Sequence, residues 1–578
     1  AGCIIAARLS DADPNLSILI VEGGPNNENI PTITHPALLF SHLAPDSKYN
    51  LYYQANKSHA LAGRQLVVPA GGVLGGGSSV NLMVYSRAQR SDFDAWKAPG
   101  WTADNMLEYM KKLETYHGPD QLDRHGSAGP MHVSGAGFRS SRLEDEFISA
   151  ATKAGWPEID DLQTMDAVNG VQRAMRYVDP DGKRQDTAHQ YLHPRIKDGQ
   201  HPNLHVLLES QVNHVIFDDR RAVGLEYQPN PAFQQSTPGT TQTVKAKRMV
   251  ILACGALGTP LVLERSGVGG ADILNAAGIS PIANVQGVGR HYQDHHMMIY
   301  SYKSSLGREE TLDALCSGRL DSRHLIDQNA AMMGWNSVDV SCKLRPEEAE
   351  VSSLGPAFEK LWNEEFKSET DRPLMMASLC GCFPGDPTAV PEGQYFSIAV
   401  FSTYPLSRGH MHITGPSLSD TPDFDDGFLS DPNDVDIKVH LWMYKKQREI
   451  SRKMNLFRGE VAGTHPNFST QSQAAFTDGE LPSDALNLEY DGADDEVIEN
   501  WIRKNIGSTW HSLGTCKMAP RDEGGVVDSH LSVYGVEALK VADLSVPPSN
   551  IAANSNNVAM AIAEKAADIF IKELGLGE

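Results

Sequence analysis

The sequence lacks the features of disulfide-stabilised, membrane-spanning and nucleic-acid-binding proteins. Its 578 residues include seven cysteines, an odd number spread along a long chain, so they do not form a disulfide framework. The longest apolar run, residues 249–263, is interrupted by Gly255, Gly258 and Pro260 and is too short and broken to span a bilayer. A net charge of −23 would repel nucleic acid and anionic membranes. We therefore expect neither as a partner.

Metal-binding spacings and internal repeats are also missing from the sequence. Cys380-Gly381-Cys382 is too close for a usual zinc pair and has no matching second pair, so no metal site is predicted. No methionine begins the chain, and residues 2–9 already have the pattern of a helix. This start suggests missing residues upstream, so an amino-terminal signal cannot be judged. The proportions of hydrophobic (40%) and charged (21%) residues are those of a globular protein, long enough for two domains.

The first pattern that is present is half of a dinucleotide-binding motif. Residues 16–21 have the composition of a buried parallel strand, and Glu22 stands at its carboxyl end. The spacing from Gly2 to Glu22 is that of the acidic residue that binds a ribose hydroxyl. Gly2 then corresponds to the last glycine of G-x-G-x-x-G, which allows close helix–strand packing. A helix, a strand and a glutamate also occur together by chance, so this half-motif is weak alone.

A glycine-rich run at residues 71–81 strengthens the nucleotide-binding interpretation. Five glycines in eleven residues indicate that the backbone approaches something closely, since glycine in a regular element costs chain entropy. Successive free N–H groups suit a pyrophosphate. Ser78 and Ser79 would add hydroxyl donors, and Asn81 could bond the edge of a ring. The alternative, a flexible linker, fits poorly with the apolar residues on both sides.

Further elements follow from local patterns. Residues 101–116 and 558–571 have the spacing of amphipathic helices, and residues 204–208, 212–217 and 222–227 that of strands. A buried strand at 248–254 runs directly into a glycine turn and a helix. Such a strand–turn–helix unit suits a phosphate or a ring at the start of the helix.

Several of these segments resemble the glucose–methanol–choline (GMC) oxidoreductases. Residues 255–269 are similar to the second signature of that family at every specified position. Residues 71–94 resemble the first signature, with a departure at Gly72, where a basic or amide residue is usual. Residues 287–295 and 405–409 and the segments around His511 and Asn554 also look like the family, so the resemblance covers essentially the whole chain. Within the family, residues 510–516 and 539–554 are most similar to fungal alcohol oxidases.

The resemblance implies FAD and an α/β fold, in which a Rossmann-like FAD-binding domain carries an inserted α+β substrate-binding domain built on an antiparallel sheet. The FAD-binding domain is expected at residues 1–145, 200–300 and 505–578, and the substrate-binding domain at 146–199 and 301–504. Residues 395–401 and 410–413 have the pattern of sheet strands in that second domain. Some members attach FAD covalently through a histidine in the serine–glycine loop. Val80 stands at that position here, so non-covalent FAD is expected.

Two residues are predicted to carry the chemistry. His511 is the candidate base, because a histidine pKa lies near working pH, and Asn554 can donate an N–H to the substrate oxygen. The helix after Asn554 would point its positive end at the flavin, with Ser555, Asn556 and Asn557 as suitable caps. The resemblance implies cofactor contacts at Gly2, Glu22, Gly75, Gly76, Ser78, Ser79, Asn81, Val212, Asp543, Leu544 and Ser555, and a substrate pocket at Leu82, Met83 and Trp510.

Each of these residues has an ordinary structural interpretation when taken alone. A histidine after a tryptophan is more often structural than catalytic, and an asparagine such as Asn554 is more often a cap or turn residue. Trp510 either lines the pocket or fills the core. Of the 21 histidines, most are expected to be bystanders, including His291, His295 and His296.

The leading hypothesis is oxidation of a primary alcohol to an aldehyde, with O2 reduced to H2O2. A dehydrogenase that uses a quinone or another acceptor, a lyase like the hydroxynitrile lyases of this fold, and a non-catalytic protein are the alternatives. The apolar residues 82–84 favour a small uncharged alcohol. A homo-oligomer and an intracellular location, in the cytosol or peroxisome, are further expectations, although the chain ends in Gly575-Leu576-Gly577-Glu578 without a Ser-Lys-Leu signal.

Overall fold

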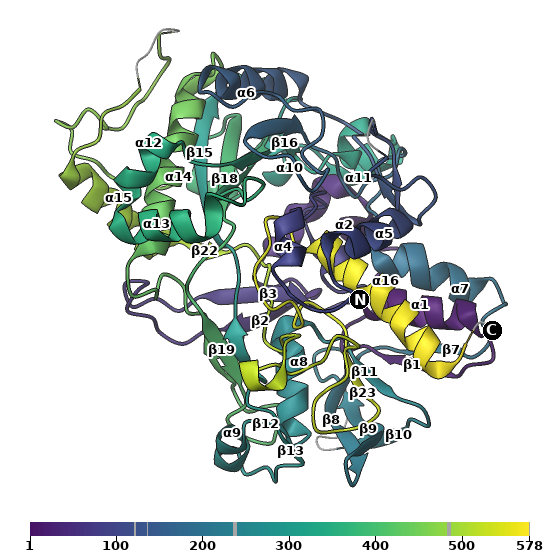
Figure 1. The fold of residues 1–578 in the computed structure, drawn as a ribbon. Helices are drawn as coiled ribbons and strands as arrows, with labels where there is room; N and C mark the ends of the chain where they lie inside the picture. Colours follow the sequence, from purple (N-terminus) through teal and green to yellow (C-terminus); the bar gives the residue numbers. More distant parts are fainter. Residues whose placement is uncertain (121–122, 136, 235–239, 483–486, 577–578) are drawn as a thin grey trace.

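The computed structural model describes residues 1–120, 123–135, 137–234, 240–482 and 487–576. In these ranges, parallel strand pairs and helices form one part of the molecule, and a large antiparallel sheet forms the other (Figure 1). Within the same ranges, no helix combines the length and the apolar character needed to cross a membrane. The last two residues, Gly577 and Glu578, lie outside the described residues. They belong to the chain ending that was compared with a Ser-Lys-Leu signal.

Two pairs of parallel strands support the nucleotide-binding part. β1 (Ile18–Val21) pairs with β7 (Leu204–Leu207), and β11 (Val250–Leu252) pairs with β23 (Leu539–Val541). Parallel neighbours need a long crossover connection, because a tight turn reverses the chain direction. Each pair therefore joins segments that are far apart in the sequence. The predicted Rossmann-like α/β class is confirmed by these pairs and by the antiparallel sheet described below.

The two ends of the described chain pack together. Helix α1 (Gly2–Ala12) lies alongside helix α16 (Asn556–Leu574), as Figure 1 shows for the purple and yellow helices. Ile4 and Ala7 of α1 and Ala561 of α16 are fully buried in one apolar core. The small alanines allow the helices to approach closely, so the last helix of the chain is fixed against the first.

Strand β1 differs from the sequence-based expectation in its burial. It is parallel, as predicted, but Leu19 is 41% exposed. Leu19, Ile20 and Val21 form part of the wall of a large cavity instead of packing against protein on both faces. The apolar residues of this strand therefore line a cavity, although the sequence pattern predicts that protein covers both faces.

A seven-stranded antiparallel sheet forms the second part, in the order β21–β15–β18–β17–β16–β6, with β22 beside β15. Its strands are β6 (Gly170–Arg173), β15 (His296–Ser304), β16 (Val338–Leu344), β17 (Met375–Cys380), β18 (Tyr395–Ser402), β21 (Phe457–Glu460) and β22 (Gly507–Ser508). This confirms the predicted antiparallel platform and its strand at 395–401. The strand predicted at 410–413, β19 (Gly409–His412), belongs instead to a small sheet with β14 (Arg290–Tyr292) and β20 (Asp423–Asp425). The proposed domain boundaries stay a prediction.

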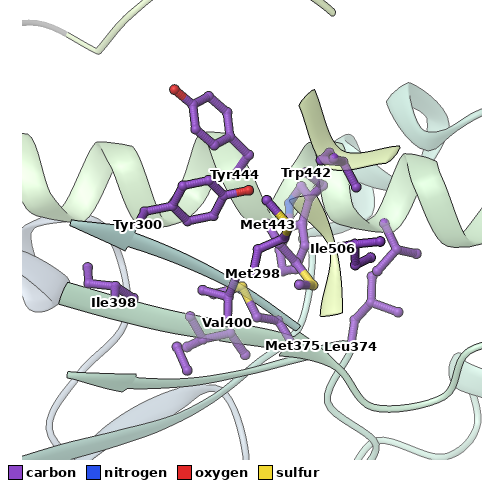
Figure 2. Close-up of a cluster of buried hydrophobic side chains, with 14 of the residues drawn as sticks. Met298, Tyr300, Leu374, Met375, Ile398, Val400, Trp442, Met443, Tyr444 and Ile506 are labelled. Atoms are coloured by element: carbon purple, nitrogen blue, oxygen red, sulfur yellow. The ribbon is translucent and has the colours of Figure 1, made fainter. Parts of the chain in front are cut away.

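The two faces of the large sheet have different roles. One face packs against helix α14 (Val435–Arg452), where Met298, Tyr300 and Val400 meet Trp442, Met443 and Tyr444 (Figure 2). Side chains alternate across a strand, so the residues between these point the other way. Met297 of β15 and Phe401 of β18 are paired in register, and both line the cavity. The sheet therefore has its core on one face and the wall of the site on the other.

A buried carboxylate connects three helices of the nucleotide-binding part. Glu564 of α16 is fully buried and accepts a hydrogen bond from Arg8 Nη2 of α1 at 2.8 Å. The Tyr191 hydroxyl donates to the same carboxylate at 2.6 Å, and Lys112 Nζ of α5 (Ala103–Leu113) lies 3.2 Å away. The carboxylate thus has a partner on each side, which makes its burial tolerable.

Replacing Glu564 with alanine is expected to destabilise the protein by about 2–4 kcal/mol, because Arg8 and Tyr191 lose a buried acceptor. Asp568→Asn is the matched control on the same helix. Asp568 also pairs with Lys112 but is partly exposed, so its loss is expected to cost less than about 1 kcal/mol. Denaturant unfolding of the holoprotein measures both changes. Equal losses would contradict a special role for the buried carboxylate.

Candidate active site

A cavity of about 1530 Å³ is walled by both parts of the molecule. Pockets for a single small molecule usually have about 300–1,000 Å³, so this one has room for a dinucleotide and a second molecule. Ser79, a predicted cofactor contact, does not line it. The other predicted site residues all do: Gly2, Glu22, Gly75, Gly76, Ser78, Asn81, Leu82, Met83, Val212, Trp510, His511, Asp543, Leu544, Asn554 and Ser555.

Glu22 follows β1 at one end of the cavity. Its Oε1 accepts a hydrogen bond from the Gly24 N–H at 2.8 Å, and burial raises the pKa of its carboxyl. A Cβ on Gly24 would lie 2.0 Å from the Gly72 carbonyl oxygen, so the two glycine segments are in direct backbone contact. A Cβ on Gly72 would come within 2.9 Å of the Leu51 side chain, so this position has little room for a side chain. The close packing expected at Gly2 is not present, since a Cβ there would reach Ala253 at an ordinary 3.6 Å.

The serine–glycine loop is held together by its own hydroxyl groups. Gly75 and Gly76 have φ values of 89° and 59°, which favour glycine. The Ser78 hydroxyl donates to the Gly75 carbonyl, and the Ser79 hydroxyl donates to the Leu74 carbonyl, each at 2.8 Å. Both hydroxyls are thus engaged within the loop in this structure, and their predicted contacts with a cofactor stay a prediction. The hydroxyls fix the loop, and its backbone faces the cavity.

Asp543 joins two other segments at the cavity wall. Its Oδ2 accepts from the Gly255 N–H at 2.9 Å and from the Thr259 hydroxyl at 2.6 Å, at the start of helix α8 (Gly255–Arg265). Asn81 is fixed in a similar way, because its amide oxygen accepts from the Met83 N–H and from Arg184. These contacts hold the predicted cofactor residues in position.

His511 and Asn554 meet at the other end of the cavity. His511 Nε2 lies 3.4 Å from Asn554 Nδ2. The preceding residue, Trp510, has a φ of 62°, an unusual value for a bulky side chain, and its N–H donates to the Ser508 hydroxyl at 2.7 Å. Backbone strain of this kind is often found where a functional group must be aimed. Burial lowers the pKa of His511 well below its usual value, and a positive charge on neighbouring His295 would lower it further, so the imidazole is neutral near pH 7.

Ser86 orients the amide of Asn554. Its hydroxyl donates to Asn554 Oδ1 at 2.9 Å and accepts from the Asn554 backbone N–H at 2.7 Å. With its oxygen occupied, the amide presents its NH2 group to His511. Sequence reasoning missed Ser86, because it lies 468 positions from Asn554 and local patterning gives no signal of the contact.

His295 is a second residue that sequence reasoning missed. It was expected to be a bystander, but its Nδ1 lies 2.9 Å from His511 Nδ1. Its neighbour Asp294 accepts hydrogen bonds from the backbone N–H groups of both His295 (2.7 Å) and His511 (3.0 Å). The QDH stretch at 293–295, already noted for its family resemblance, was the available signal.

Helix α16 begins directly after Asn554 and Ser555. Ser555 is the N-cap residue, but its side chain makes no capping bond, and Asn557 Nδ2 donates to the Tyr177 hydroxyl instead. The predicted side-chain capping by these two residues is therefore wrong. The amino end of a 19-residue helix still faces the cavity and carries partial positive charge.

The wall near His511 is apolar on the sheet side. In addition to the predicted Leu82, Met83 and Trp510, it contains Met297, Ala399 and Phe401, and the Phe401 ring meets the His511 ring edge to face at 5.6 Å. Ser378 of β17 adds a hydroxyl-bearing residue. All of these side chains are uncharged, so this end of the cavity suits an uncharged molecule.

Comparison with known proteins identifies the family. GMC oxidoreductase family models match residues 48–297 and 405–563. The chain is 36% identical to an alcohol oxidase of Candida boidinii, covering 99% of this chain and 94% of the relative. The chain belongs to the GMC oxidoreductase family.

Two further comparisons support the membership. An alcohol oxidase of Pichia angusta is 35% identical over 99% of this chain and 94% of its own length. Among solved structures, an FAD-dependent oxidoreductase from Chaetomium thermophilum has a TM-score of 0.80 and 26% identity, with 100% of this chain and 98% of the other covered. The structural similarity therefore covers both the nucleotide-binding part and the antiparallel-sheet part.

The residues of this GMC oxidoreductase fit FAD. The Gly24–Gly72 contact and the positive φ values at Gly75 and Gly76 let bare backbone line one end of the cavity. Glu22 stands at the carboxyl end of β1, where a ribose hydroxyl is bound in dinucleotide folds. The backbone near these glycines would hold the pyrophosphate, and His511 and Asn554 would face the ring.

Gly24→Ala is expected to reduce flavin content and to destabilise the protein by about 1–3 kcal/mol, because the new Cβ meets a backbone oxygen that cannot move alone. Gly23→Ala is the matched control, since a Cβ there would meet only the Gln211 side chain at 3.8 Å. The flavin absorbance per mole of protein and the thermal midpoint measure the difference. Normal flavin content in Gly24→Ala would contradict the proposed backbone contact.

Proposed function

We propose that this protein is an FAD-dependent alcohol oxidase, which converts a primary alcohol to an aldehyde and reduces O2 to H2O2. The observation that carries the proposal is the pairing of a neutral, buried His511 with the amide of Asn554 on the wall of the cofactor cavity. A neutral imidazole can take a proton, and an amide NH2 can donate to an oxygen that gains negative charge.

The residues divide the work of removing a proton from the alcohol. When bound, FAD supplies the hydride acceptor. His511 Nε2 accepts the hydroxyl proton, and Asn554 Nδ2 donates to the alcohol oxygen. Ser86 holds the Asn554 oxygen away, so that the amide faces the substrate with its donor. Phe401 and Met297 keep the region near the base apolar, which strengthens these polar contacts.

The relatives favour an oxidase over the alternatives. Proteins named alcohol oxidase align with nearly the whole chain at 35–36% identity. A dehydrogenase with another acceptor would turn over without O2, and a lyase would not reduce the flavin at all. A small uncharged alcohol is the proposed substrate class, because the wall near His511 is apolar and uncharged.

His511→Ala is expected to lower kcat for alcohol oxidation about 10²–10⁴-fold, because no group then accepts the hydroxyl proton. Asn554→Ala is expected to lower it about 10²–10³-fold, through loss of one donor to the developing oxyanion. Flavin bleaching by a short alcohol under argon measures reduction, and peroxide release in air measures reoxidation. Wild-type protein that bleaches under argon but forms no peroxide in air would favour the dehydrogenase.

We also propose that FAD is bound non-covalently. The loop position at which some family members carry an attaching histidine is Val80, which lines the cavity and has no nucleophilic group. The expected result is that denaturation in guanidinium followed by ultrafiltration releases all flavin into the filtrate. Flavin retained with the denatured chain would contradict this proposal and would indicate covalent attachment at a residue other than Val80.

A further inference from the structure

The contact between His295 and His511 joins their two Nδ1 atoms, so a hydrogen bond between them needs one shared proton. The Nδ1 atoms are 2.9 Å apart, and the rings meet edge to face with an interplanar angle of 85°. Both side chains are buried, with 0% and 8% exposure. In such a pair, one nitrogen must carry hydrogen and the other must offer a lone pair.

The surroundings of His511 decide which nitrogen carries the hydrogen. Asn554 Oδ1 accepts from Ser86, so the amide turns its NH2 group toward His511 Nε2. A nitrogen that faces a donor must present a lone pair. Neutral His511 therefore carries its proton on Nδ1 and donates it to His295 Nδ1.

The tautomer of His295 follows from the same contact. Of its two ring nitrogens, Nδ1 faces His511, and Nε2 makes no hydrogen bond in the part of the chain that the structure describes. The neutral ring therefore carries its proton on Nε2 and offers the lone pair of Nδ1 to His511.

Burial keeps His295 in this accepting form. Desolvation lowers the pKa of His295 to about 4, so the ring stays neutral across the usual working range. A charged His295 would place a second proton between the two Nδ1 atoms. A neutral acceptor also differs from a carboxylate, since it fixes the orientation of the base without raising its pKa strongly.

We propose that His295 is a positioning residue, whose Nδ1 accepts the Nδ1 proton of His511 and so keeps a lone pair on His511 Nε2 directed into the cavity. This inference rests on the proposed function, in which His511 is the base. Asp294 holds the backbone of both histidines through their N–H groups. The His295 side chain therefore acts on the tautomer of His511 and not on the position of its backbone.

The charged and titratable groups around the pair are few. Asp294 contacts the two backbone N–H groups, and Tyr292 donates to its carboxylate. His296 of β15 is buried, and burial lowers its pKa to about 3. Positive charge on His295 or Arg408 would lower the pKa of His296 further. Phe401 stacks on the His295 ring at 5.1 Å and carries no charge.

Two substitutions of His295 separate the acceptor from the shape of the ring. In His295→Asn, the side-chain oxygen can occupy the place of Nδ1, so kcat is expected to stay within about threefold of wild type. In His295→Leu, the acceptor is lost, so kcat is expected to fall about 10- to 100-fold, as when other hydrogen-bond partners of functional histidines are removed, with little change in KM. His296→Leu is the control for loss of a buried imidazole on the same strand, and its kcat is expected to remain unchanged.

The pH profile provides a readout that a purely structural role would not change. An acceptor at Nδ1 stabilises the imidazolium more than the neutral ring, so its loss lowers the pKa of His511. The acid limb of kcat/KM is expected to move to lower pH in His295→Leu and to stay in place in His295→Asn and His296→Leu. Flavin absorbance and the thermal midpoint identify any variant that fails to fold.

A second measurement does not depend on alcohol turnover. Diethyl pyrocarbonate modifies unprotonated histidine, and the difference between wild type and His511→Ala isolates the reaction of His511. The pH dependence of that difference is expected to shift in His295→Leu and not in His295→Asn. A wild-type protein without alcohol turnover would refute the proposed function, and this measurement would still test the role of His295.

Three outcomes would overturn the inference. They are full activity with an unchanged pH profile in flavin-loaded His295→Leu, equal loss of activity in flavin-loaded His295→Asn and His295→Leu, and identical modification profiles of His511 in all variants. If His295→Leu does not fold, His295→Asn decides alone, because a loaded but inactive variant contradicts the proposed acceptor.

Discussion

The catalytic end of the cavity depends on the buried carboxylate of Asp294. It accepts hydrogen bonds from the backbone N–H groups of His295 and His511 and from the hydroxyls of Tyr292 and Ser508. It thereby joins segments that are 217 positions apart. Burial raises the pKa of Asp294 to about 6, and its four donors limit the rise because they favour the charged form. Without these donors, a carboxylate would not remain ionised at this depth.

The way in which Asp294 makes these contacts matters for the chemistry. A carboxylate bonded to a ring nitrogen of His511 would favour the imidazolium and raise its pKa. Asp294 bonds to backbone N–H groups instead, and the ring nitrogen meets the neutral His295. The same site can therefore hold a negative charge for structure and a neutral imidazole for proton transfer.

The two ends of the cavity are built on different physical principles. At the nucleotide end, glycines bring backbone against backbone, as between Gly24 and Gly72, and the hydroxyls of Ser78 and Ser79 are used inside the loop. At the catalytic end, side chains from distant segments orient one another. The large antiparallel sheet supports this end because one of its faces packs on α14 (Figure 2), while residues of the other face line the cavity.

Local sequence determined the elements and the kind of site. Period-2 and helical patterns predicted strands such as 395–401 and the last helix, the glycine run at 71–81 marked a close backbone approach, and the family resemblance selected His511 and Asn554. Only the tertiary structure decided the burial of β1, the partners of β19, the internal use of the serine hydroxyls, and the roles of Ser86 and His295. The reason is physical: periodicity and backbone preferences act within a few residues, whereas Ser86 and Asn554, or His295 and His511, meet only because separate elements pack together.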